Sequence, residues 1–499
     1  MLRRLIADRR VGLVAALLVA VLPVARVAAE AVNLDTVPVT DPTPIDPQTL
    51  TWTPYEVKTI KPDFKKAKAN KLEKTSLKFG MIKLTDCIPI IAAKELGFFA
   101  EEGLNVTIEV QPNWKAVNDR VINMELDGSH MLYNHPLGAA IGYGVNAELV
   151  CPYNMSINGM GLSVSNALFA EMAVKEPRLK EWGYAMPIGA EPIKQIAAER
   201  KAGGKEPLRM YMTFPSGSHN ITLRYWLAAG GVNPGYYEGY SDAIGKKDAD
   251  VLLSVNPPPL MAQAMAQGNC DAFCVGEPWN MQVTLKDFTG RPVCPSQYIF
   301  RGSPDKIFAC SKEWADANPN TLVAVVKGLI RAGQWLDESK GHRKLAVEML
   351  AHKDYIGANY AVLAESMLGS YSYAVERDAT GAVTKVDRRP EPTFNTFYHD
   401  FGSFPYKSHA VWGLTQARRW GQIPENKSDS WYLEIADKTF RPDIYRKAFA
   451  ALVAEGKVKA ESLPAEDYRS YPAEAFIDKK PFDPKKPNDY LKSFPIGLK

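Results

Sequence analysis

The sequence predicts an α/β protein made of two lobes, each with a β-sheet covered by helices. Strand-like and helix-like patterns alternate from about residue 76, and a second alternating block begins near residue 208. A chain of 499 residues is also longer than one compact lobe requires. The composition, 46% hydrophobic and 23% charged, is that of an ordinary globular protein.

Each element of the first block has a recognisable local signal. Pro89 suits the first turn of a helix that Thr85 or Asp86 is expected to cap, and Gly97 ends that helix. We expect strands at Leu77–Ile82, Val106–Val110 and His130–Tyr133, with further helix at Ala116–Met124.

The second block repeats this alternation. We expect strands at Leu208–Thr213, Val251–Val255, Ala272–Val275 and Lys306–Cys310, and helices at Asn220–Ala229 and Asn320–Leu336. This order predicts mostly parallel sheets, whose ligands bind outside the carboxyl ends of the strands, here in a cleft between the lobes. The predicted organisation is a Pro-rich arm at 30–74, the first part of lobe I with a hinge insertion at 75–205, lobe II at 206–300, and a return to lobe I followed by a helical, wrapping segment at 301–499.

Residues 1–29 predict a signal peptide. Four arginines precede the apolar run Val11–Ala25, and small residues follow it. A membrane anchor is the alternative, but the run is shorter than the roughly 20 residues that cross a bilayer. The segment holds five arginines and one aspartate, so the rest of the chain has 55 basic and 55 acidic residues. A neutral chain lacks the positive field that nucleic-acid binding needs.

No motif for catalysis or for metal binding stands out. The sequence has no G-x-S-x-G, H-E-x-x-H or Walker pattern. His130 and His135 have no evident third metal ligand, and no histidine lies at metal-ligand spacing from Cys270 and Cys274. The six cysteines are expected to be buried small residues. We therefore predict a binding protein without cofactor or metal.

The loop Ser216–His219, between a strand and a helix, suggests an anion site. Gly217 lets the backbone approach closely, Ser218 is expected to cap the helix, and the helix start favours negative charge. Lys306 at a strand edge and Trp114 after a strand offer a cation and an indole N–H. The ordinary alternatives are a capped helix with a surface histidine, a solvated lysine and a packing tryptophan.

From about Leu77 to the C-terminus the chain resembles the periplasmic nitrate- and bicarbonate-binding proteins of ABC importers. The motifs that carry this resemblance are Leu84-Thr85-Asp86, Gly97-Phe98-Phe99, Asp127-Gly128-Ser129-His130, Thr213 to His219, Arg224 to Gly231, Pro257-Pro258-Pro259, Phe273 to Trp279, Tyr406-Lys407-Ser408-His409 and Arg419-Trp420-Gly421.

The resemblance implies a two-lobed, C-shaped fold of the class II type that binds a small anion between its lobes. It places Trp114, His219 and Lys306 at the anion, and we add Thr85, Gly217, Ser218 and Met160 to the expected site. Lysine at position 306 is typical of nitrate-type members, whereas bicarbonate-type members have an acidic residue that helps bind calcium. Met160 departs from the family pattern Asn-Gly-Gln-Ala and removes an amide donor.

The expected function is therefore capture of nitrate in the periplasm, closure of the lobes and delivery to a membrane permease by a monomeric protein. Lobe closure is expected to bring Lys306 of one lobe towards His219 of the other. The bound anion needs such a cation and N–H donors around it, because burying an unpaired charge costs several kcal/mol. Bicarbonate, cyanate, a sulfonate or an organic solute are alternative cargoes. An enzyme like the pyrimidine-synthesising proteins of related fold, and a receptor that signals, are alternatives of another class.

Overall fold

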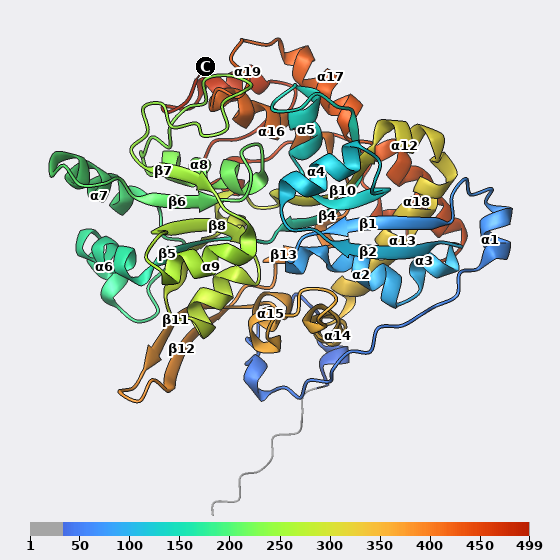
Figure 1. The fold of residues 1–499 in the computed structure, drawn as a ribbon, viewed down its shortest axis with the longest axis horizontal. Helices are drawn as coiled ribbons and strands as arrows, with labels where there is room; N and C mark the ends of the chain where they lie inside the picture. Colours follow the sequence, from blue (N-terminus) through green and yellow to red (C-terminus); the bar gives the residue numbers. More distant parts are fainter. Residues whose placement is uncertain (1–32, 499) are drawn as a thin grey trace, which may run out of the picture. The chain divides into compact units, whose positions relative to one another are not determined.

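The computed structural model describes residues 33–498, so the predicted signal peptide lies outside the described residues. Lobe I is organised around a six-stranded sheet of order β13-β4-β10-β3-β1-β2 (Figure 1). Its strands are β1 (Ser76–Met81), β2 (Asn105–Val110), β3 (Gly128–Leu132), β4 (Leu149–Asn158), β10 (Pro304–Ser311) and β13 (Asn395–Thr396). Its helices include α2 (Ile88–Glu95), α3 (Phe98–Glu101), α4 (Trp114–Ile122), α5 (His135–Ala140), α12 (Lys312–Ala317) and α13 (Pro319–Glu338).

Lobe II contains a five-stranded sheet of order β7-β6-β8-β5-β9. Its strands are β5 (Met160–Ser165), β6 (Arg209–Met212), β7 (Leu252–Val255), β8 (Ala272–Gly276) and β9 (Gly290–Pro295). Its helices are α6 (Asn166–Lys175), α7 (Glu191–Ala202), α8 (Ser218–Ala229), α9 (Pro258–Ala266), α10 (Trp279–Met281) and α11 (Ser296–Ile299). Every strand and helix predicted in the two blocks is present, with ends shifted by a few residues.

Lobe II starts earlier than the boundary predicted at residue 206. Strand β4 of the first sheet leads through Asn158 and Gly159 into β5 of the second sheet, and α6 packs on β5 and β9. Both linking residues have positive φ, 63° and 81°, which turns the chain from one sheet to the other. The predicted hinge insertion therefore belongs to lobe II. Strands β4 and β5 are buried almost throughout, so no change in burial marks the crossing between the lobes.

The sheets are mixed, which corrects the prediction that they are mostly parallel. Strand β1 pairs in parallel with β2 and β3, and β6 pairs in parallel with β7 and β8. Strand β10 is antiparallel to β3 and β4, and β5 is antiparallel to β8 and β9. Strands β5 and β10 bring the chain from one lobe to the other. Each therefore enters its sheet from the end opposite to that of the strands beside it.

The Pro-rich arm has little regular structure but is packed on lobe I. It contains only η1 (Leu34–Thr36), η2 (Pro47–Thr49) and α1 (Phe64–Ala69) among its described residues. The Lys58 backbone N–H donates to Glu95 Oε2 at 2.9 Å, and Trp52 stacks on Tyr360 with ring centroids 5.3 Å apart. The arm is thus an extended, docked segment.

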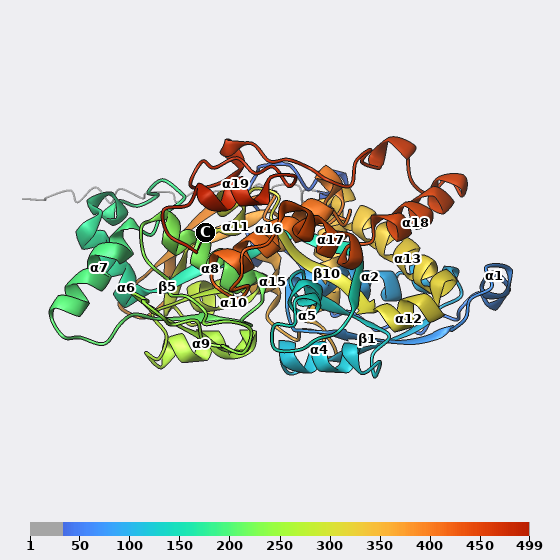
Figure 2. The ribbon, with the colours of Figure 1, turned by 90° about the horizontal axis from the view of Figure 1, so that it is seen from above.

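The C-terminal part contacts both lobes. It comprises α14 (Lys340–Ala351), α15 (Tyr360–Met367), the hairpin β11 (Ser370–Arg377) and β12 (Val383–Pro390), α16 (Lys407–Arg419), α17 (Asp429–Thr439), α18 (Pro442–Ala454) and α19 (Pro487–Lys492). Helix α18 packs on α13 of lobe I, whereas α16 contacts both α5 and α8. Figure 2 shows the orange to red helices α16–α19 of this part along one side of both lobes.

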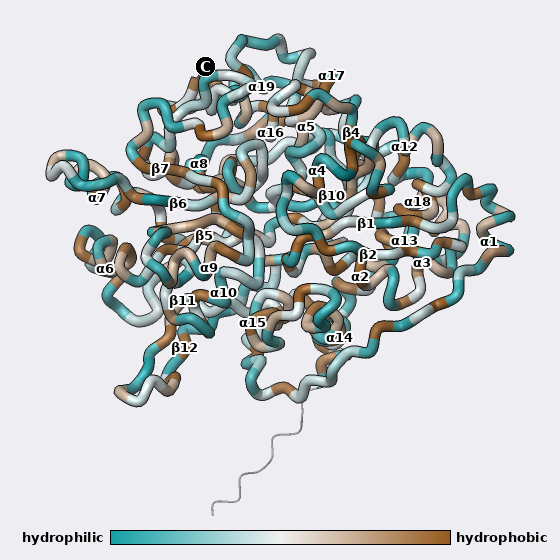
Figure 3. Tube along the Cα trace, in the orientation of Figure 1, coloured by the Kyte–Doolittle hydropathy of each residue, from teal (hydrophilic) through white to brown (hydrophobic). Residues whose placement is uncertain are grey.

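Burial follows the amphipathic pattern of the elements. Hydrophobic and hydrophilic residues alternate along helices such as α13, which buries one face (Figure 3). The six cysteines are buried and free. Within residues 33–498, no helix combines the length and apolar character needed to cross a bilayer.

Candidate functional site

A buried polar cluster lies where elements of the two lobes meet. Lobe I contributes the turn after β1, the first residues of α4 and α5, and the start of β10. Lobe II contributes the first turn of α8. The cluster consists of Thr85, Asp86, Trp114, His130, His135, His219, Asp305 and Lys306, each at most 2% exposed. Such a concentration of buried polar groups makes this cluster the candidate functional site.

Lys306 does not face the cluster as an isolated cation. Its Nζ lies 3.0 Å from Asp86 Oδ2 and also pairs with Asp305 Oδ1. Burial works to lower the pKa of Lys306, but its contacts with Asp305 and Asp86 outweigh burial and the pKa is raised. The lysine is therefore charged, and its charge is already balanced by protein groups.

Burial raises the pKa of both carboxyls, but their net pKa shifts have opposite signs. Burial is the largest influence on each, but Lys306 and His130 overcome it at Asp86 and lower the pKa of that carboxyl. At Asp305, burial and the neighbouring Asp86 raise the pKa to about 8. At neutral pH the cluster thus contains an ionised Asp86, a charged Lys306 and a protonated Asp305. These three groups have no net charge together.

His130 is fully hydrogen-bonded, which fixes its tautomer. The Ile82 backbone N–H donates to Nδ1 at 3.3 Å, so Nε2 carries the proton and donates to Asp86 Oδ1 at 2.8 Å. Burial lowers the pKa of His130, so the ring is neutral. The indole of Trp114 packs on it with ring centroids 5.2 Å apart.

Several groups of the cluster keep an unused hydrogen-bonding atom, and three of them belong to the predicted site. Trp114 Nε1, His219 Nε2 and Thr85 Oγ1 are buried and have no hydrogen-bond partner among the residues that the structure describes. The other nitrogen of His219, Nδ1, lies 2.7 Å from Thr213 Oγ1, which holds the ring in place. When the Thr213 hydroxyl donates to Nδ1, the proton of His219 is on Nε2, which is then a donor. An unsatisfied buried donor costs about 1–3 kcal/mol, so three of them together suggest a ligand that accepts hydrogen bonds.

The scan of known families matches residues 70–351 to the NMT1-like family. The chain belongs to the NMT1-like family.

Among curated proteins, the nitrate/nitrite binding protein NrtA of Nostoc sp. PCC 7120 is 32% identical over 86% of this chain and 88% of its own length. NrtA of Synechococcus elongatus PCC 7942 is also 32% identical, over 83% and 84% of the two chains. The crystal structure of the periplasmic nitrate-binding protein NrtA from Synechocystis PCC 6803 matches with a TM-score of 0.72 and 27% identity, over 85% of this chain and all of that one. The predicted family and the two-lobed binding-protein fold are confirmed.

In this NMT1-like chain the loop before α8 approaches lobe I closely. A Cβ atom on Gly217 would lie 2.6 Å from Leu132 Cδ1, so a larger residue would have to displace the Leu132 side chain of lobe I. The predicted cap is wrong, because Gly217 is the N-cap and Ser218 is the first helical residue. The Ser218 hydroxyl instead donates to Asp305 Oδ1 at 3.4 Å, across the lobe boundary.

The remaining predicted residues also lie at the junction. The predicted capping by Thr85 or Asp86 is not seen, since the N-cap of α2 is Cys87. The Thr85 backbone N–H donates to the Glu277 carbonyl of lobe II at 2.8 Å. Met160, 1% exposed, accepts from Thr222 Oγ1 through its sulfur at 3.8 Å and offers no donor.

Sequence reasoning missed part of the cluster. Asp305 was not among the expected site residues, and Asp86 was expected only as a possible cap and as part of a family motif. His135 was considered only as a metal ligand. Among residues 33–498 no group of three or more His, Cys, Asp or Glu side chains is placed to hold a metal ion. A carboxylate directly preceding a lysine in a buried strand was the available signal for Asp305.

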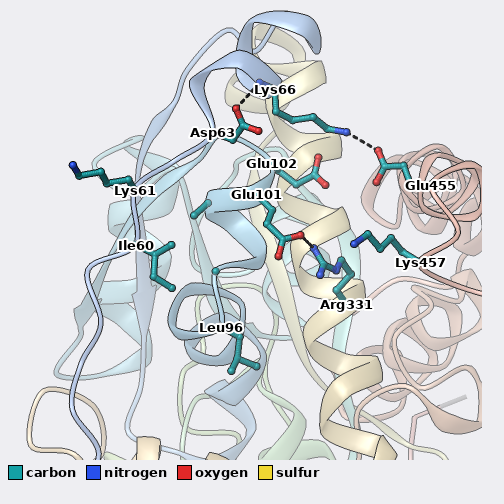
Figure 4. Close-up of a pocket in the computed structure, with 12 residues that line it drawn as sticks. Ile60, Lys61, Asp63, Lys66, Leu96, Glu101, Glu102, Arg331, Glu455 and Lys457 are labelled. Carbon is teal, nitrogen blue, oxygen red and sulfur yellow. Dashed lines mark hydrogen bonds and ion pairs between the residues drawn. The ribbon is translucent and has the colours of Figure 1, made fainter.

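Two surface cavities differ from the cluster. One, of about 290 Å³, lies at the lobe junction and is lined by Ile82, Lys83, Val110, Gln111 and Pro112 of lobe I and Pro259 of lobe II. The other, of about 530 Å³, lies between the arm, α3, α13 and the end of α18 (Figure 4). Several of its charged side chains pair with one another, for example Lys66 with Glu455 at 2.8 Å and Arg331 with Glu101 at 2.5 Å.

Proposed function

We propose that this protein is the substrate-binding protein of an ABC importer and that its cargo is nitrate. The observation that carries the proposal is the set of buried, unused donors at the lobe junction: Trp114 Nε1, His219 Nε2 and the Thr85 hydroxyl. Nitrate has three oxygen acceptors and no donor, so it matches a site made of donors. The similarity to nitrate/nitrite binding proteins over most of the chain supports the same cargo.

In this proposal the site binds an anion although it holds no unpaired cation to offset the anion's charge. Because Asp86, Lys306 and the protonated Asp305 have no net charge together, attraction comes from N–H and O–H dipoles and from the start of the twelve-residue helix α8. Neutral donors suit a weakly hydrated, singly charged anion, because removing such an anion from water costs little free energy. The role of Lys306 in this account is to keep Asp86 ionised and in place, which in turn orients His130 and the indole of Trp114.

The wider role follows from the same proposal. An exported binding protein would capture nitrate in the periplasm as a monomer, close its lobes around it and deliver it to a membrane permease. The relatives named as binding proteins support a transport role rather than catalysis. Removal of the signal peptide predicted at residues 1–29 would release the mature protein.

Calorimetric titration tests this function. The chain without residues 1–29 is titrated with nitrate, nitrite, cyanate, an alkanesulfonate, and bicarbonate with and without calcium. We expect tight, saturable binding of nitrate and a thermal stabilisation of about 2.7 kcal/mol at 100 times the dissociation constant. Binding of bicarbonate or a sulfonate in preference to nitrate would overturn the cargo. An absence of binding to every anion would overturn the transport proposal.

A further inference from the structure

His135 is the first residue of α5 and is 2% exposed. Neither of its ring nitrogens has a hydrogen-bond partner within the described part of the chain. The imidazole stands edge-on to Trp114, with ring centroids 5.7 Å apart, and edge-on to Phe214 of the lobe II loop, at 5.0 Å. It therefore lies between the indole donor of lobe I and the loop that leads into α8.

Comparison with the other buried histidines sets His135 apart. His130 uses both nitrogens, with Ile82 and Asp86. His219 uses Nδ1 with Thr213, and His409 uses Nε2 with the Tyr471 hydroxyl at 2.7 Å. Each of these three rings is held by at least one hydrogen bond, whereas His135 is held by aromatic packing alone among the residues described.

Packing alone does not account for a histidine at this position. A phenylalanine ring would fill the same space beside Trp114 and Phe214 without burying two unsatisfied polar atoms, each of which disfavours folding. A buried polar group left unsatisfied in a folded protein calls for an explanation, and a bound ligand that accepts its hydrogen bond is one. Burial is the main cause that lowers the pKa of His135 to about 3, and the nearby His130 and Lys306 act in the same direction. The ring is therefore neutral and carries one N–H and one lone pair.

We propose that His135 is a further anion-binding residue, which donates its ring N–H to an oxygen of the bound nitrate beside the Trp114 indole. This inference rests on the proposed function and adds a donor that neither the family resemblance nor the predicted site included. One side of the anion then faces His135 and Trp114 of lobe I, and the other faces His219 of lobe II. Because the neutral ring has a single N–H, the ligand atom that it faces must be an acceptor.

Two substitutions separate hydrogen bonding from packing. His135→Phe keeps an aromatic ring against Trp114 and Phe214 but removes the donor, whereas His135→Gln keeps a donor on a different frame. We expect His135→Phe to lose roughly 10- to 100-fold in nitrate affinity and His135→Gln to recover part of the loss. The melting temperature of ligand-free His135→Phe should equal or exceed that of the unsubstituted chain.

His409→Phe is the matched control, because it also exchanges a buried histidine that packs on an aromatic ring. It breaks the bond to Tyr471, so it should lower the melting temperature and leave nitrate affinity unchanged. If His135→Phe binds nitrate as tightly as the unsubstituted protein, the inference is wrong while the proposed function stands. If the unsubstituted protein binds none of the anions, the proposed function and this inference fail together.

Nitrogen-15 NMR of the seven histidines gives a readout that folding defects do not mimic. The His135 signals are identified as those missing from His135→Gln. Saturating nitrate should shift one ring nitrogen of His135 as a hydrogen-bonded N–H donor and leave the ring neutral. Unchanged His135 signals in the nitrate complex would overturn the inference.

Discussion

The polar cluster at the lobe junction and the charged cavity beside the arm differ in the features that indicate where a ligand binds. The cavity of Figure 4 is large and rich in charge, yet the charged groups that line it include the pairs Lys66–Glu455 and Arg331–Glu101. The junction is closed and has no net charge among Asp86, Asp305 and Lys306, yet Trp114, His135 and His219 keep unused hydrogen-bonding atoms.

Buried polar atoms are therefore a better guide to the site than charge or volume. Exposed ion pairs contribute little and are satisfied by water as well as by each other. A buried donor without a partner carries its full desolvation cost until a ligand accepts its hydrogen bond. The four predictions that follow test this difference by perturbing the two regions in matched ways.

The largest effect is expected from Lys306→Met. The substitution leaves Asp86 without its cation inside the protein, so we expect a loss of about 3–5 kcal/mol in the free energy of unfolding and of measurable nitrate binding. Lys66→Met in the arm-side cavity breaks a pair whose side chains are about 30% exposed and should cost less than about 1 kcal/mol. Chemical denaturation measures both. Equal costs would contradict the contrast between the two regions.

Trp114→Phe should weaken nitrate binding by about 10- to 100-fold, because it removes a donor without a protein partner. The ligand-free protein should lose little stability beyond that due to the smaller ring. Trp226→Phe is the control, since its indole donates to the Ile188 carbonyl at 2.9 Å and is equally buried. That variant should lose about 1–3 kcal/mol more stability and keep its nitrate affinity. Calorimetry and thermal melts compare the pair, and the reverse pattern would refute the assignment.

Nitrate affinity should fall as the pH rises past the raised pKa of Asp305, about 8. Below that value the carboxyl is neutral, and above it a negative charge lies beside the anion. At pH 9 we expect about tenfold weaker binding than at pH 7, since each pH unit above the pKa removes about nine-tenths of the protonated form. Asp305→Asn, which imitates the protonated carboxyl, should bind independently of pH across this range. An unchanged pH profile in that variant would point to another group.

The raised pKa of Asp305 also has a consequence for stability. Because the folded state holds this proton more tightly than the unfolded chain, the contribution of Asp305 to stability is present below its ordinary pKa of 3.8 and is lost as the pH rises towards 8. Asp86, whose pKa is lowered, acts in the opposite sense and loses its contribution as the pH falls below its ordinary value.

The smallest effect is expected from Arg331→Ala in the arm-side cavity. Its partner Glu101 is half exposed, so the pair should contribute less than about 1 kcal/mol. Nitrate affinity should equal that of the unsubstituted chain. A marked loss of nitrate binding in this variant would mean that the arm-side cavity takes part in capture.

Local sequence patterns predicted the helices and strands. The features that were missed depend on how strands pair in the folded chain. The alternation at Val106–Val110 and the turn before α8 are short-range signals, so β2 and α8 appear where expected. The crossing at Asn158 and Gly159 depends on two positive φ values between two buried strands, and neither strand signals from its sequence that the chain changes sheets.

The site was predicted only in part for the same reason. Trp114, His219 and Lys306 were expected from residue type and resemblance, and the structure brings them to one junction. The neutralisation of Lys306 arises because Asp86, distant in sequence, meets Asp305 across strands β1, β3 and β10. The two unused nitrogens of His135 result from burial among aromatic rings contributed by separate elements, which a linear sequence does not display.

A crystal structure of the mature chain grown with nitrate tests the central claim most directly. The account predicts trigonal density at the lobe junction within hydrogen-bonding distance of Trp114 Nε1 and His219 Nε2, with the arm-side cavity free of nitrate. Nitrate bound in the arm-side cavity, or a junction that stays without nitrate at saturating concentration, would contradict the account.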